Sequence, residues 1–579
     1  MEFSDDILQT AQLAGCAAAV VISTIRTVIA LDLSFLVDDE EPRVLSFTIF
    51  TPLFRIRSLM DFDLSYNCIQ GELLGDSLAN MSKLVSLDLD GNSFQGNIPK
   101  EIGNMTKLQQ LSLSYNNFFG EIPASILNLK ELKELYLSDN SLSMEIPIDI
   151  GNLSNITTLD FSYNKLTGTS SIQKLTKLET LYSQNNLLTG TIPSSIQKLT
   201  KLKALNLENN KLTGDIPSCL FNIKGLVYLY LGGNNLIWNN NTKIVTKFML
   251  EGLAMKSFGL AGEIPDWIPK QKTLAYLDLS ENQLEGMFPL GLLEMNLVYI
   301  DLSDNKLKGS LPPSLFNNTN LSVLSLSRNN FYGELPSNIG EIPTTFSQGT
   351  RFLSLAKNKF SGRLSRNLSY MSNLEYLDIH DNKITGELPH FICQISTLQI
   401  LNLQNNSLQG SIPDCISNLA SLRILDLSSN HLVGEIPAKF RNLVGMIETP
   451  DDFSYFADIN ITYIGFEIKI NDLILNWKSN NKLTGKIPVG SQMDTMDDPN
   501  FYANNSGLCG MQIKVPCLEN LSPTYPPEVE SKETWFSWEG VGIGYAVGFF
   551  VAVGNLYLIG YFVPTKPPNH RRKQRMQRI

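Results

Sequence analysis

The chain has 579 residues, of which 43% are hydrophobic and 18% are charged, a balance typical of a folded chain rather than a disordered one. It carries 57 acidic and 46 basic residues, and six of the basic ones lie in the last 16 positions, so the rest of the chain has a net charge of −17. This charge argues against a nucleic-acid-binding protein. Its four His and seven Cys residues form no CxxC, no HExxH and no cluster at metal-ligand spacing, so we expect no metal and no cofactor.

Residues 1–58 form an atypical N-terminal segment. Met1 to Thr10 is acidic, and the apolar run from Ala14 to Val37 is interrupted by Arg26 and Asp32, so it is a poor secretory signal. We therefore expect the start of the sequence to be incomplete.

From residue 59 to 438 one phrase, LxxLxLxxNxLxGxIP, recurs with a period near 24. Three copies read LQQLSLSYNNFFGEIP (Leu108 to Pro123), LKALNLENNKLTGDIP (Leu202 to Pro217) and LQILNLQNNSLQGSIP (Leu398 to Pro413). The position of the internal Asn defines 16 units, at Asn67, Asn92, Asn116, Asn140, Asn164, Asn186, Asn210, Asn234, Phe258, Asn282, Asn305, Asn329, Asn358, Asn382, Asn406 and Asn430.

The phrase predicts an α/β-type repeat solenoid with short inner parallel strands. In LxL both Leu side chains point into the coil while their neighbours face outward on a strand. The Asn amide can bond the backbone of adjacent coils as a ladder, so Phe258 in its place predicts a local defect. Gly and Pro turn the chain on the outer wall. No unit can bury its apolar face alone, so the units must stack.

Aromatic residues recur at outward-facing strand positions and predict a ligand-binding track on the inner face. Five of them lie six residues before the repeat mark and three lie four residues before it: Tyr228, Tyr276, Tyr299, Phe352 and Tyr376, then Tyr136, Tyr182 and Tyr230. Rigid aromatic side chains concentrate binding energy at interfaces, although Tyr is also common in strands for structural reasons. The column Asp278, Asp301, Asp378 and Asp426 is interpreted as structural.

Beyond the repeats, residues 439–479 lose the LxL pattern and form an island or degenerate insertion. Residues 480–518 resume with NNKLTGKIP and end in a cap, where Cys509 and Cys517 are expected to pair. The first half of that last unit is missing, because Asn476 and Lys478 occupy the places of its inward Leu residues. Cys393 and Cys415 lie in adjacent units and either pair or remain buried thiols, since Cys219 occupies the same position as Cys415.

The C-terminal part reads as an acidic juxtamembrane linker (519–539), a transmembrane helix (540–563) and a short basic cytoplasmic tail (564–579). The 24 residues from Gly540 to Val563 carry no charge and span about 36 Å as a helix. Gly540, Gly544 and Gly548 form a double GxxxG, which either permits a partner helix to approach or reflects the ordinary Gly content of membrane helices.

Twelve Asn-x-Ser/Thr sequons fit a secreted ectodomain. They are Asn80, Asn104, Asn152, Asn155, Asn240, Asn317, Asn320, Asn367, Asn405, Asn460, Asn504 and Asn520.

The repeat phrase, the island, GLCG with its Cys partner, the acidic stretch, the single span and the basic tail together resemble plant leucine-rich-repeat receptor-like proteins, over about Leu59 to Ile579. NKLTGKIPVGSQMDTMDDPNFYANNSGLCG is especially similar to the end of their ectodomains. The resemblance implies a plant-type leucine-rich-repeat superhelix, no kinase domain, and signalling through adaptor and co-receptor receptor-like kinases, with the GxxxG glycines at the adaptor contact. This chain departs from the family in lacking a Cys-paired cap before Leu59 and whole repeats after the island, as a truncated member would.

We therefore expect a receptor-like protein of the plasma membrane, single-pass type I with an extracellular N-terminal ectodomain, which binds a peptide, protein or glycan and acts in plant immunity. No enzyme is expected, because 16 residues after Val563 cannot form a catalytic domain and no nucleophile motif accompanies His380, His390 or His431. The alternatives are a developmental peptide co-receptor, a binding inhibitor of a foreign wall-degrading enzyme, and a non-functional truncated member.

Overall fold

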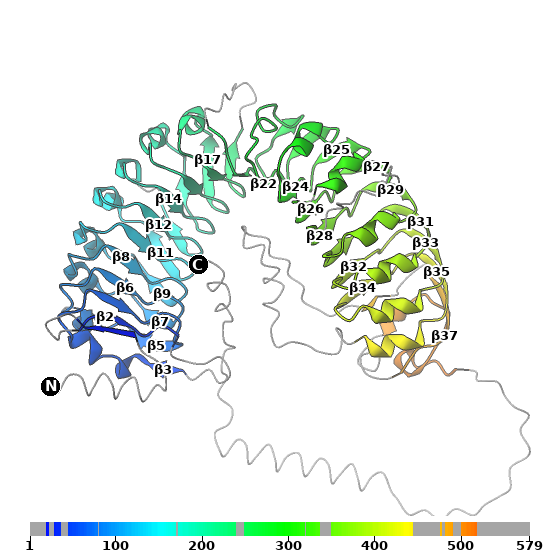
Figure 1. Cartoon of the computed structure of the whole chain (residues 1–579), viewed down its shortest axis with the longest axis horizontal. Helices are drawn as coiled ribbons and strands as arrows, with labels where there is room; N and C mark the ends of the chain where they lie inside the picture. Colours follow the sequence, from blue (N-terminus) through cyan, green and yellow to red (C-terminus); the bar gives the residue numbers. More distant parts are fainter. Residues whose placement is uncertain are drawn as a thin grey trace, which may run out of the picture. The chain divides into compact units, whose positions relative to one another are not determined.

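The computed structural model describes residues 19–22, 28–35, 44–78, 80–168, 172–238, 248–318, 320–335, 349–443, 475–476, 481–489 and 499–517. Nearly all of them belong to one compact unit, Met1 to Val515, in which short coils stack side by side (Figure 1). Most described coils consist of an inner strand, a turn with an Asn, an outer strand and a 3-10 helix. The predicted repeat solenoid is confirmed.

The inner wall of the described coils is one 19-stranded sheet, parallel throughout except for the antiparallel pair β1–β2. Each strand pairs with the same position of the next coil, as in Leu111 with Leu135, so inward Leu residues stack on inward Leu residues. The strands follow in chain order: β1 (Ala19–Ile22), β2 (Val28–Asp32), β4 (Asp61–Asp63), β6 (Ser86–Asp88), β8 (Gln110–Ser112), β10 (Glu134–Tyr136), β12 (Thr158–Asp160), β14 (Thr180–Tyr182), β16 (Ala204–Asn206), β18 (Tyr228–Tyr230), β20 (Gly252–Ala254), β22 (Tyr276–Asp278), β24 (Tyr299–Asp301), β26 (Val323–Ser325), β28 (Phe352–Ser354), β30 (Tyr376–Asp378), β32 (Ile400–Asn402), β34 (Ile424–Asp426) and β36 (Leu475–Asn476).

The second strand of each coil contributes to an outer wall that falls into sheets of six, three and ten strands. The first sheet holds β3 (Leu45–Ser46), β5 (Ile69–Glu72), β7 (Ser93–Gly96), β9 (Asn117–Gly120), β11 (Ser141–Glu145) and β13 (Lys165–Thr167), and the second holds β15 (Thr189–Gly190), β17 (Lys211–Asp215) and β19 (Asn235–Ile237). The third holds β21 (Ala261–Gly262), β23 (Gln283–Gly286), β25 (Lys306–Gly309), β27 (Asn330–Glu334), β29 (Lys359–Gly362), β31 (Lys383–Glu387), β33 (Ser407–Gly410), β35 (His431–Gly434), β37 (Lys482–Lys486) and β38 (Gly507–Cys509).

The chain returns to the inner wall through short 3-10 helices, most of which begin directly after the Pro of the repeat phrase. Pro suits this position because the first turn of a helix needs no N–H from it. The helices are η1 (Phe47–Ile49), η2 (Leu53–Arg55), η3 (Lys100–Asn104), η4 (Ala124–Asn128), η5 (Ile148–Asn152), η6 (Ile172–Lys174), η7 (Ser194–Lys198), η8 (Ser218–Asn222), η9 (Leu290–Glu294), η10 (Pro313–Asn317), η11 (Arg366–Tyr370), η12 (His390–Gln394), η13 (Asp414–Asn418), η14 (Ala438–Asn442), η17 (Pro499–Tyr502) and η18 (Met511–Ile513), with one α-helical turn, α2 (Gly75–Leu78).

The predicted Asn ladder joins each coil to the one before it. The side-chain amide of Asn116 donates to the carbonyl oxygens of Leu89 (2.9 Å), Leu113 (3.2 Å) and Ser114 (3.0 Å), and its Oδ1 accepts the Phe94 N–H (3.0 Å). The same pattern repeats at the other Asn marks, so the turns of those coils are held by a side chain that bonds the backbone of two coils.

Phe258 marks the predicted defect, and the outer wall is interrupted there, between β19 and β21, while the inner sheet continues through β18, β20 and β22. Phe258 itself is buried in the core, at 3% exposure. Close by in the chain, three rings pack against one another: Phe221 lies 5.4 Å from Trp267 and 6.0 Å from Trp238 between ring centroids. Aromatic side chains therefore pack in the coils on both sides of the interruption. We call the interruption of the outer wall between β19 and β21 the seam.

The solenoid begins before Leu59, which corrects the predicted boundary. β2 pairs in parallel with β4, with Leu31 opposite Phe62, and both Leu31 and Leu33 are buried. Asn67 donates its side-chain amide to the Leu33 carbonyl at 2.7 Å, so the ladder reaches this coil as well. The phrase LDLS at residues 31–34 resembles the repeat, but the Asn position holds Leu36, and the absence of Asn conceals the unit.

The C-terminal boundary also changes. η14 extends the sixteenth unit to Asn442 and Leu443 is fully buried, so residues 439–443 belong to the repeats rather than to the island. β36 then pairs in parallel with β34, with Leu475 opposite Leu425. The inner strand of the next unit is therefore present. The sequence pattern missed it because Leu475 lies six residues before Asn481 instead of five. The Asn481 side-chain amide donates to the Leu427 carbonyl at 3.0 Å.

The cap and the cysteines complete the described unit. Asn505 continues the ladder by accepting the Leu483 N–H at 3.1 Å. Cys393 and Cys415 form a disulfide with a Cα–Cα distance of 5.8 Å, which decides between the two alternatives, and Cys219 is a free thiol. Cys509 and Cys517 are both disulfide-bonded.

No helix among these described residues is long and apolar enough to cross a membrane, and Gly540 to Val563 lie outside them.

Candidate functional site

Six of the eight predicted aromatic residues form one continuous cluster on the outward side of the inner sheet. Register places Tyr276, Tyr299, Val323, Phe352 and Tyr376 in one row across β22 to β30, in the middle of the solenoid (Figure 1). Tyr276 stacks on Tyr299 with ring centroids 4.2 Å apart, and Phe352 stacks on Tyr376 at 4.1 Å. We call this set, together with Tyr228 and Tyr230, the aromatic row.

Gly252 allows Tyr230 to join the row. Gly252 occupies the position of Tyr276 and Tyr228 in its own coil, and a Cβ there would lie 2.0 Å from the Tyr230 hydroxyl oxygen. With no side chain in the way, the Tyr230 ring leans across β20 and meets Tyr276 edge to face, at a centroid distance of 5.5 Å. Sequence reasoning missed Gly252, because its role depends on the neighbouring coil.

The rings of the aromatic row are more buried than side chains that contact a ligand directly would be. Tyr230, Tyr276, Tyr299 and Phe352 expose 5% or less of their surface, while Tyr228 and Tyr376 at the two ends are half-buried. Stacking between neighbours covers the ring faces, so the row forms a rigid apolar floor. Polar side chains at the edges of this floor then provide most of the surface that another molecule would contact.

Tyr136 and Tyr182 do not belong to the row. They lie on β10 and β14, and the coils of β12 and β16 place Asp160 and Asn206 at the corresponding position. The Tyr136 hydroxyl donates to Glu134 at 3.1 Å, and burial, reinforced by the negative charge of Glu134, raises the pKa of Tyr136 to about 12. The structure thus divides the predicted track into a contiguous part and two separate residues.

One edge of the row carries charges of both signs, contributed by the residue that precedes each inner strand. Glu251 accepts a hydrogen bond from the Tyr228 hydroxyl at 2.6 Å. Two coils of the same edge are joined by Arg351 and Glu375 through two bonds of 2.7 and 3.1 Å. Such a bidentate pair holds both planar groups in a fixed orientation.

The opposite edge carries an acidic cluster whose carboxyl groups have raised pKa values. Burial, followed by repulsion from Asp278, raises the pKa of Glu208 to about 8 and that of Asp301 to about 7. Burial likewise raises the pKa of Asp278. Lys256 is the nearest cation, and its ammonium contacts Glu281 at 3.0 Å, so the cluster is only partly neutralised.

The Asp column has the predicted structural role. Asp278 and Asp301 each accept the backbone N–H of the Ser two residues later at 2.8 Å, which fixes the turn out of the inner strand. Asp378 makes the same bond to the His380 N–H at 3.1 Å and also contacts His380 Nδ1 at 2.7 Å. Burial acts to lower the pKa of His380, but the bond to Asp378 outweighs it and the pKa is raised.

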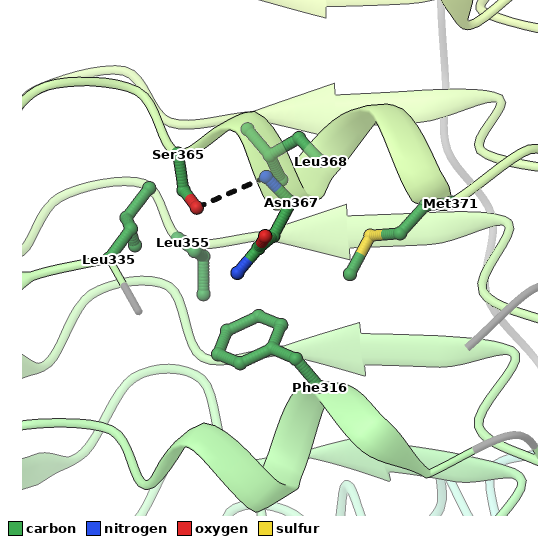
Figure 2. Close-up of a pocket in the computed structure, with 7 residues that line it drawn as sticks. All are labelled: Phe316, Leu335, Leu355, Ser365, Asn367, Leu368 and Met371. Carbon is green, nitrogen blue, oxygen red and sulfur yellow. Dashed lines mark hydrogen bonds between the residues drawn. The ribbon is translucent and has the colours of Figure 1, made fainter. Parts of the chain in front are cut away.

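A small cavity of about 20 Å³ lies between η10 and η11 (Figure 2). Its lining consists of Phe316, Leu335, Leu355, Ser365, Asn367, Leu368 and Met371. The Ser365 hydroxyl oxygen accepts the Asn367 N–H at 3.3 Å within it. The cavity holds no more than about one water molecule, so it is a packing gap and not a ligand site.

The sequons are distributed over the coil surface. Asn104, Asn152, Asn320, Asn405 and Asn504 are exposed, and Asn80, Asn155 and Asn367 are half-buried. Asn155 uses its amide to bond the Lys130 carbonyl at 2.9 Å, and Asn317 ends η10. Asn240, Asn460 and Asn520, and the glycines Gly540, Gly544 and Gly548, lie outside the described residues.

Known protein families match the repeats. The chain matches the family described as "Leucine-rich repeat region" over residues 55–306 and that described as "Leucine rich repeat" over residues 372–432. It is 46% identical over 67 residues to Receptor-like protein 46 of Arabidopsis thaliana, covering 11% of this chain and 8% of the relative. With Receptor-like protein 53 of the same plant it shares 31% identity over 198 residues, covering 27% and 21%.

Solved structures with the same fold include plant receptor ectodomains. The plant peptide hormone receptor RGFR1 in complex with RGF2 is similar with a TM-score of 0.56 and 30% identity, covering 79% of this chain and 67% of that one. A TDR receptor has a TM-score of 0.51 and 30% identity, covering 72% and 66%.

The aligned stretches span only 8% and 21% of the two curated relatives just named. The family is nevertheless clear from the repeat phrase, the parallel inner sheet, the Asn ladder and these matches taken together. The chain belongs to the leucine-rich-repeat proteins.

Proposed function

We propose that this chain is a cell-surface receptor-like protein that binds an extracellular ligand along the aromatic row and its two charged edges. The aromatic row supports this proposal, because a rigid apolar floor flanked by charges of both signs suits an extended ligand with a polar backbone and mixed side chains. No part of the proposal requires catalysis by this chain.

The proposed ligand class is an extended peptide. The solved relative RGFR1 is a peptide hormone receptor and was solved with RGF2. In this chain, Glu251 and Arg351 lie on one edge of the row and Lys256 and Glu281 on the other, so acceptors and donors are available along the whole length of a peptide. Protein and glycan ligands would contact a smaller part of the same apolar surface.

The proposal places the ectodomain outside the plasma membrane, anchored by the apolar segment Gly540 to Val563 in a single-pass type I orientation. Signalling then passes through adaptor and co-receptor receptor-like kinases, with Gly540, Gly544 and Gly548 at the helix contact. A role in plant immunity rests on the resemblance to plant receptor-like proteins.

Ligand binding is tested by passing secreted plant peptides over the purified full-length chain and identifying those retained. The double variant Glu251→Gln/Arg351→Gln removes two charged groups from one edge, and we expect at least about tenfold weaker binding of a retained peptide. Glu285→Gln/Lys359→Gln, on exposed outer strands, is the matched control and should bind normally. Equal binding by all three proteins, or retention of no peptide, would refute the site.

Topology is tested separately with a C-terminal tag in plant cells. We expect glycosidase treatment to increase the mobility of the chain, and external protease to spare the tail on sealed membranes. An unshifted chain would show that the ectodomain does not enter the secretory route.

A further inference from the structure

Six lysines crowd one side of the solenoid in three consecutive coils, those of β14, β16 and β18. They are Lys174, Lys177, Lys198, Lys201, Lys203 and Lys224, and all six are exposed. They lie on the segments that lead from η6, η7 and η8 to the inner strands, before the chain reaches the aromatic row. We call this set the lysine flank.

The repeat geometry arranges the lysines in columns. Thr180 pairs with Ala204 in the parallel inner sheet, so Lys174 and Lys198 occupy equivalent positions in adjacent coils, as do Lys177 and Lys201. Neighbouring strands of a sheet lie about 4.8 Å apart, so the two lysines of each column lie at about that spacing. Lys203 and Lys224 add charge outside these two columns, because the equivalent positions of the other coils hold Glu179, Val227, Thr176 and Thr200.

The positive charge of the flank is largely uncompensated. Among the described residues Lys203 pairs with Glu179 at 2.5 Å, and the other five lysines form no ion pair. Lys177 donates instead to the neutral side chain of Asn155 at 2.8 Å. The three segments 174–179, 198–203 and 222–227 contain six lysines and one carboxylate, in a chain whose net charge is −11.

The flank differs in this respect from the seven coils of β22 to β34 on the same side. The corresponding segments of the seven coils from β22 to β34 hold four basic and two acidic residues, Lys270, Lys272, Arg351, Arg423, Glu294 and Glu375. Two of the four basic residues there are neutralised, Lys272 by Glu294 at 3.0 Å and Arg351 by Glu375 at 2.7 Å. The lysines of the coils of β14, β16 and β18 are therefore less neutralised than the basic residues of these seven coils. The coils of β6, β8 and β10 extend the basic side with the exposed Lys83, Lys107, Lys130 and Lys133.

The chemistry of the flank favours a polyelectrolyte over a folded protein as partner. Its leucines, such as Leu175 and Leu199, are buried, and its three segments contain no Arg and no aromatic residue. Protein interfaces depend on desolvated aromatic and Arg anchors, which are absent here. Lysine ammonium groups are mobile, hydrated point charges, suited to a flexible chain that carries one charge per monomer.

We propose that the lysine flank binds a linear anionic polysaccharide of the polyuronate type, whose carboxylates align with successive coils. The choice of a polysaccharide among polyanions uses the extracellular placement proposed above. No sequon lies between Asn155 and Asn240, so the three coils themselves would carry no glycan of their own. The flank precedes the aromatic row in the chain and shares the coil of β18 with it.

The test measures binding of polygalacturonate to the immobilised full-length chain at about 50 to 200 mM salt. We expect the affinity to fall steeply with salt, and fully methyl-esterified polygalacturonate, which lacks the charge, not to bind. Replacing all six lysines of the flank by Gln should weaken binding about tenfold or more, because each exposed ion pair contributes a small amount and the six add up.

The matched control replaces six exposed lysines of the outer strands by Gln: Lys165, Lys211, Lys306, Lys308, Lys359 and Lys383. It changes the net charge by the same amount and should bind like the unaltered chain. Equal loss in both sextuple variants, or no loss in the flank variant, would overturn the proposal. Binding of polyglutamate as tight as that of polygalacturonate would also overturn it and would point to an acidic protein.

This experiment does not depend on the peptide proposal. Polysaccharide binding by the purified chain needs no signalling partner and no occupied aromatic row. A chain that retains no peptide but binds polygalacturonate through the lysine flank would leave this inference standing while the peptide-receptor function fails.

Discussion

At the scale of single residues, the buried Asn of each coil contributes most to specifying the fold. Its amide bonds carbonyl groups in two coils, and its oxygen accepts an N–H from the outer strand of the preceding coil, as at Asn305 with Leu279, Leu302, Ser303 and Leu284. These backbone groups lie away from water and have no other side chain to bond. The sequence predicted this role because the Asn recurs at a fixed place in the phrase.

Replacing Asn116 by Ala should therefore be strongly destabilising, whereas replacing its exposed neighbour Asn117 should not. The first change leaves several buried backbone groups unsatisfied, at about 1 to 3 kcal/mol each. Urea denaturation followed by circular dichroism measures the difference. Similar midpoints for the two variants would contradict the ladder.

The acidic cluster beside the aromatic row predicts the direction of a pH effect. The folded pKa of Glu208, about 8, lies above its ordinary value of 4.5, so the folded chain retains a proton that the unfolded chain releases. Stability contributed by this group is then complete below about pH 4.5 and is lost as the pH rises through 8. Asp301, with a pKa of about 7, acts in the same direction.

We expect Glu208→Gln to flatten the decline in melting temperature between pH 5 and pH 8, because Gln cannot release a proton. The exposed Glu285→Gln serves as control and should leave the profile unchanged. A Glu208→Gln profile as steep as that of the unaltered chain would show that this carboxyl is ionised throughout. The sequence placed Asp278 and Asp301 in one column, but it did not predict their interaction with Glu208, which comes from another coil and acts on Asp278 only after the coils stack.

At the scale of elements, the aromatic row depends on a strand that lacks a side chain at one position. Gly252→Val should displace the Tyr230 ring, since a Cβ would lie 2.0 Å from its hydroxyl oxygen. Overpacking of this kind costs about 1 to 3 kcal/mol. Near-ultraviolet circular dichroism should report the loss of Tyr packing. Gly225→Ala, whose nearest contact would be the Leu202 carbonyl at 3.3 Å, is the milder control.

The disulfide between η12 and η13 joins two adjacent coils. Cys393 and Cys415 are separated by 22 residues, and closing a loop of this size stabilises a chain by roughly 3 kcal/mol in the entropy model. Cys393→Ser/Cys415→Ser should lower the denaturation midpoint by a corresponding amount. Cys219→Ser, at the equivalent place in another coil, should have little effect, and equal effects would assign the loss to packing and not to the covalent link.

At the scale of the whole solenoid, the period, the parallel sheet and the outward aromatic column were all predictable, because each follows from one repeated phrase. The two ends were not predicted correctly. The first coil has Leu36 where the phrase has Asn, and β36 lies one residue closer to the N-terminus relative to Asn481 than the phrase requires, so pattern matching failed at both ends. The charged edges of the row were also missed, because their side chains come from different coils and come together only after the coils stack.

The seam at Phe258 makes a further prediction for hydrogen exchange. In the preceding coil, the Leu212 N–H is bonded to Asn234 at 3.0 Å, but Phe258 offers Leu236 no such acceptor. We expect the Leu236 amide to exchange faster than the Leu212 amide in the native protein, as measured by NMR or mass spectrometry. Equal protection of the two amides would show that another acceptor bonds the Leu236 N–H.

The seam also gives the solenoid an anisotropic stiffness. A bend that shortens the inner wall compresses a continuous ladder of hydrogen bonds, whereas a bend that lengthens the outer wall at β19 and β21 breaks none between these two strands. Elastic deformation should therefore concentrate at the interruptions of the outer wall, and the one between the coils of β18 and β22 lies where the aromatic row begins. A ligand that seats across those coils would change the local curvature, and the two arms of the solenoid would act as levers that magnify that change at their ends.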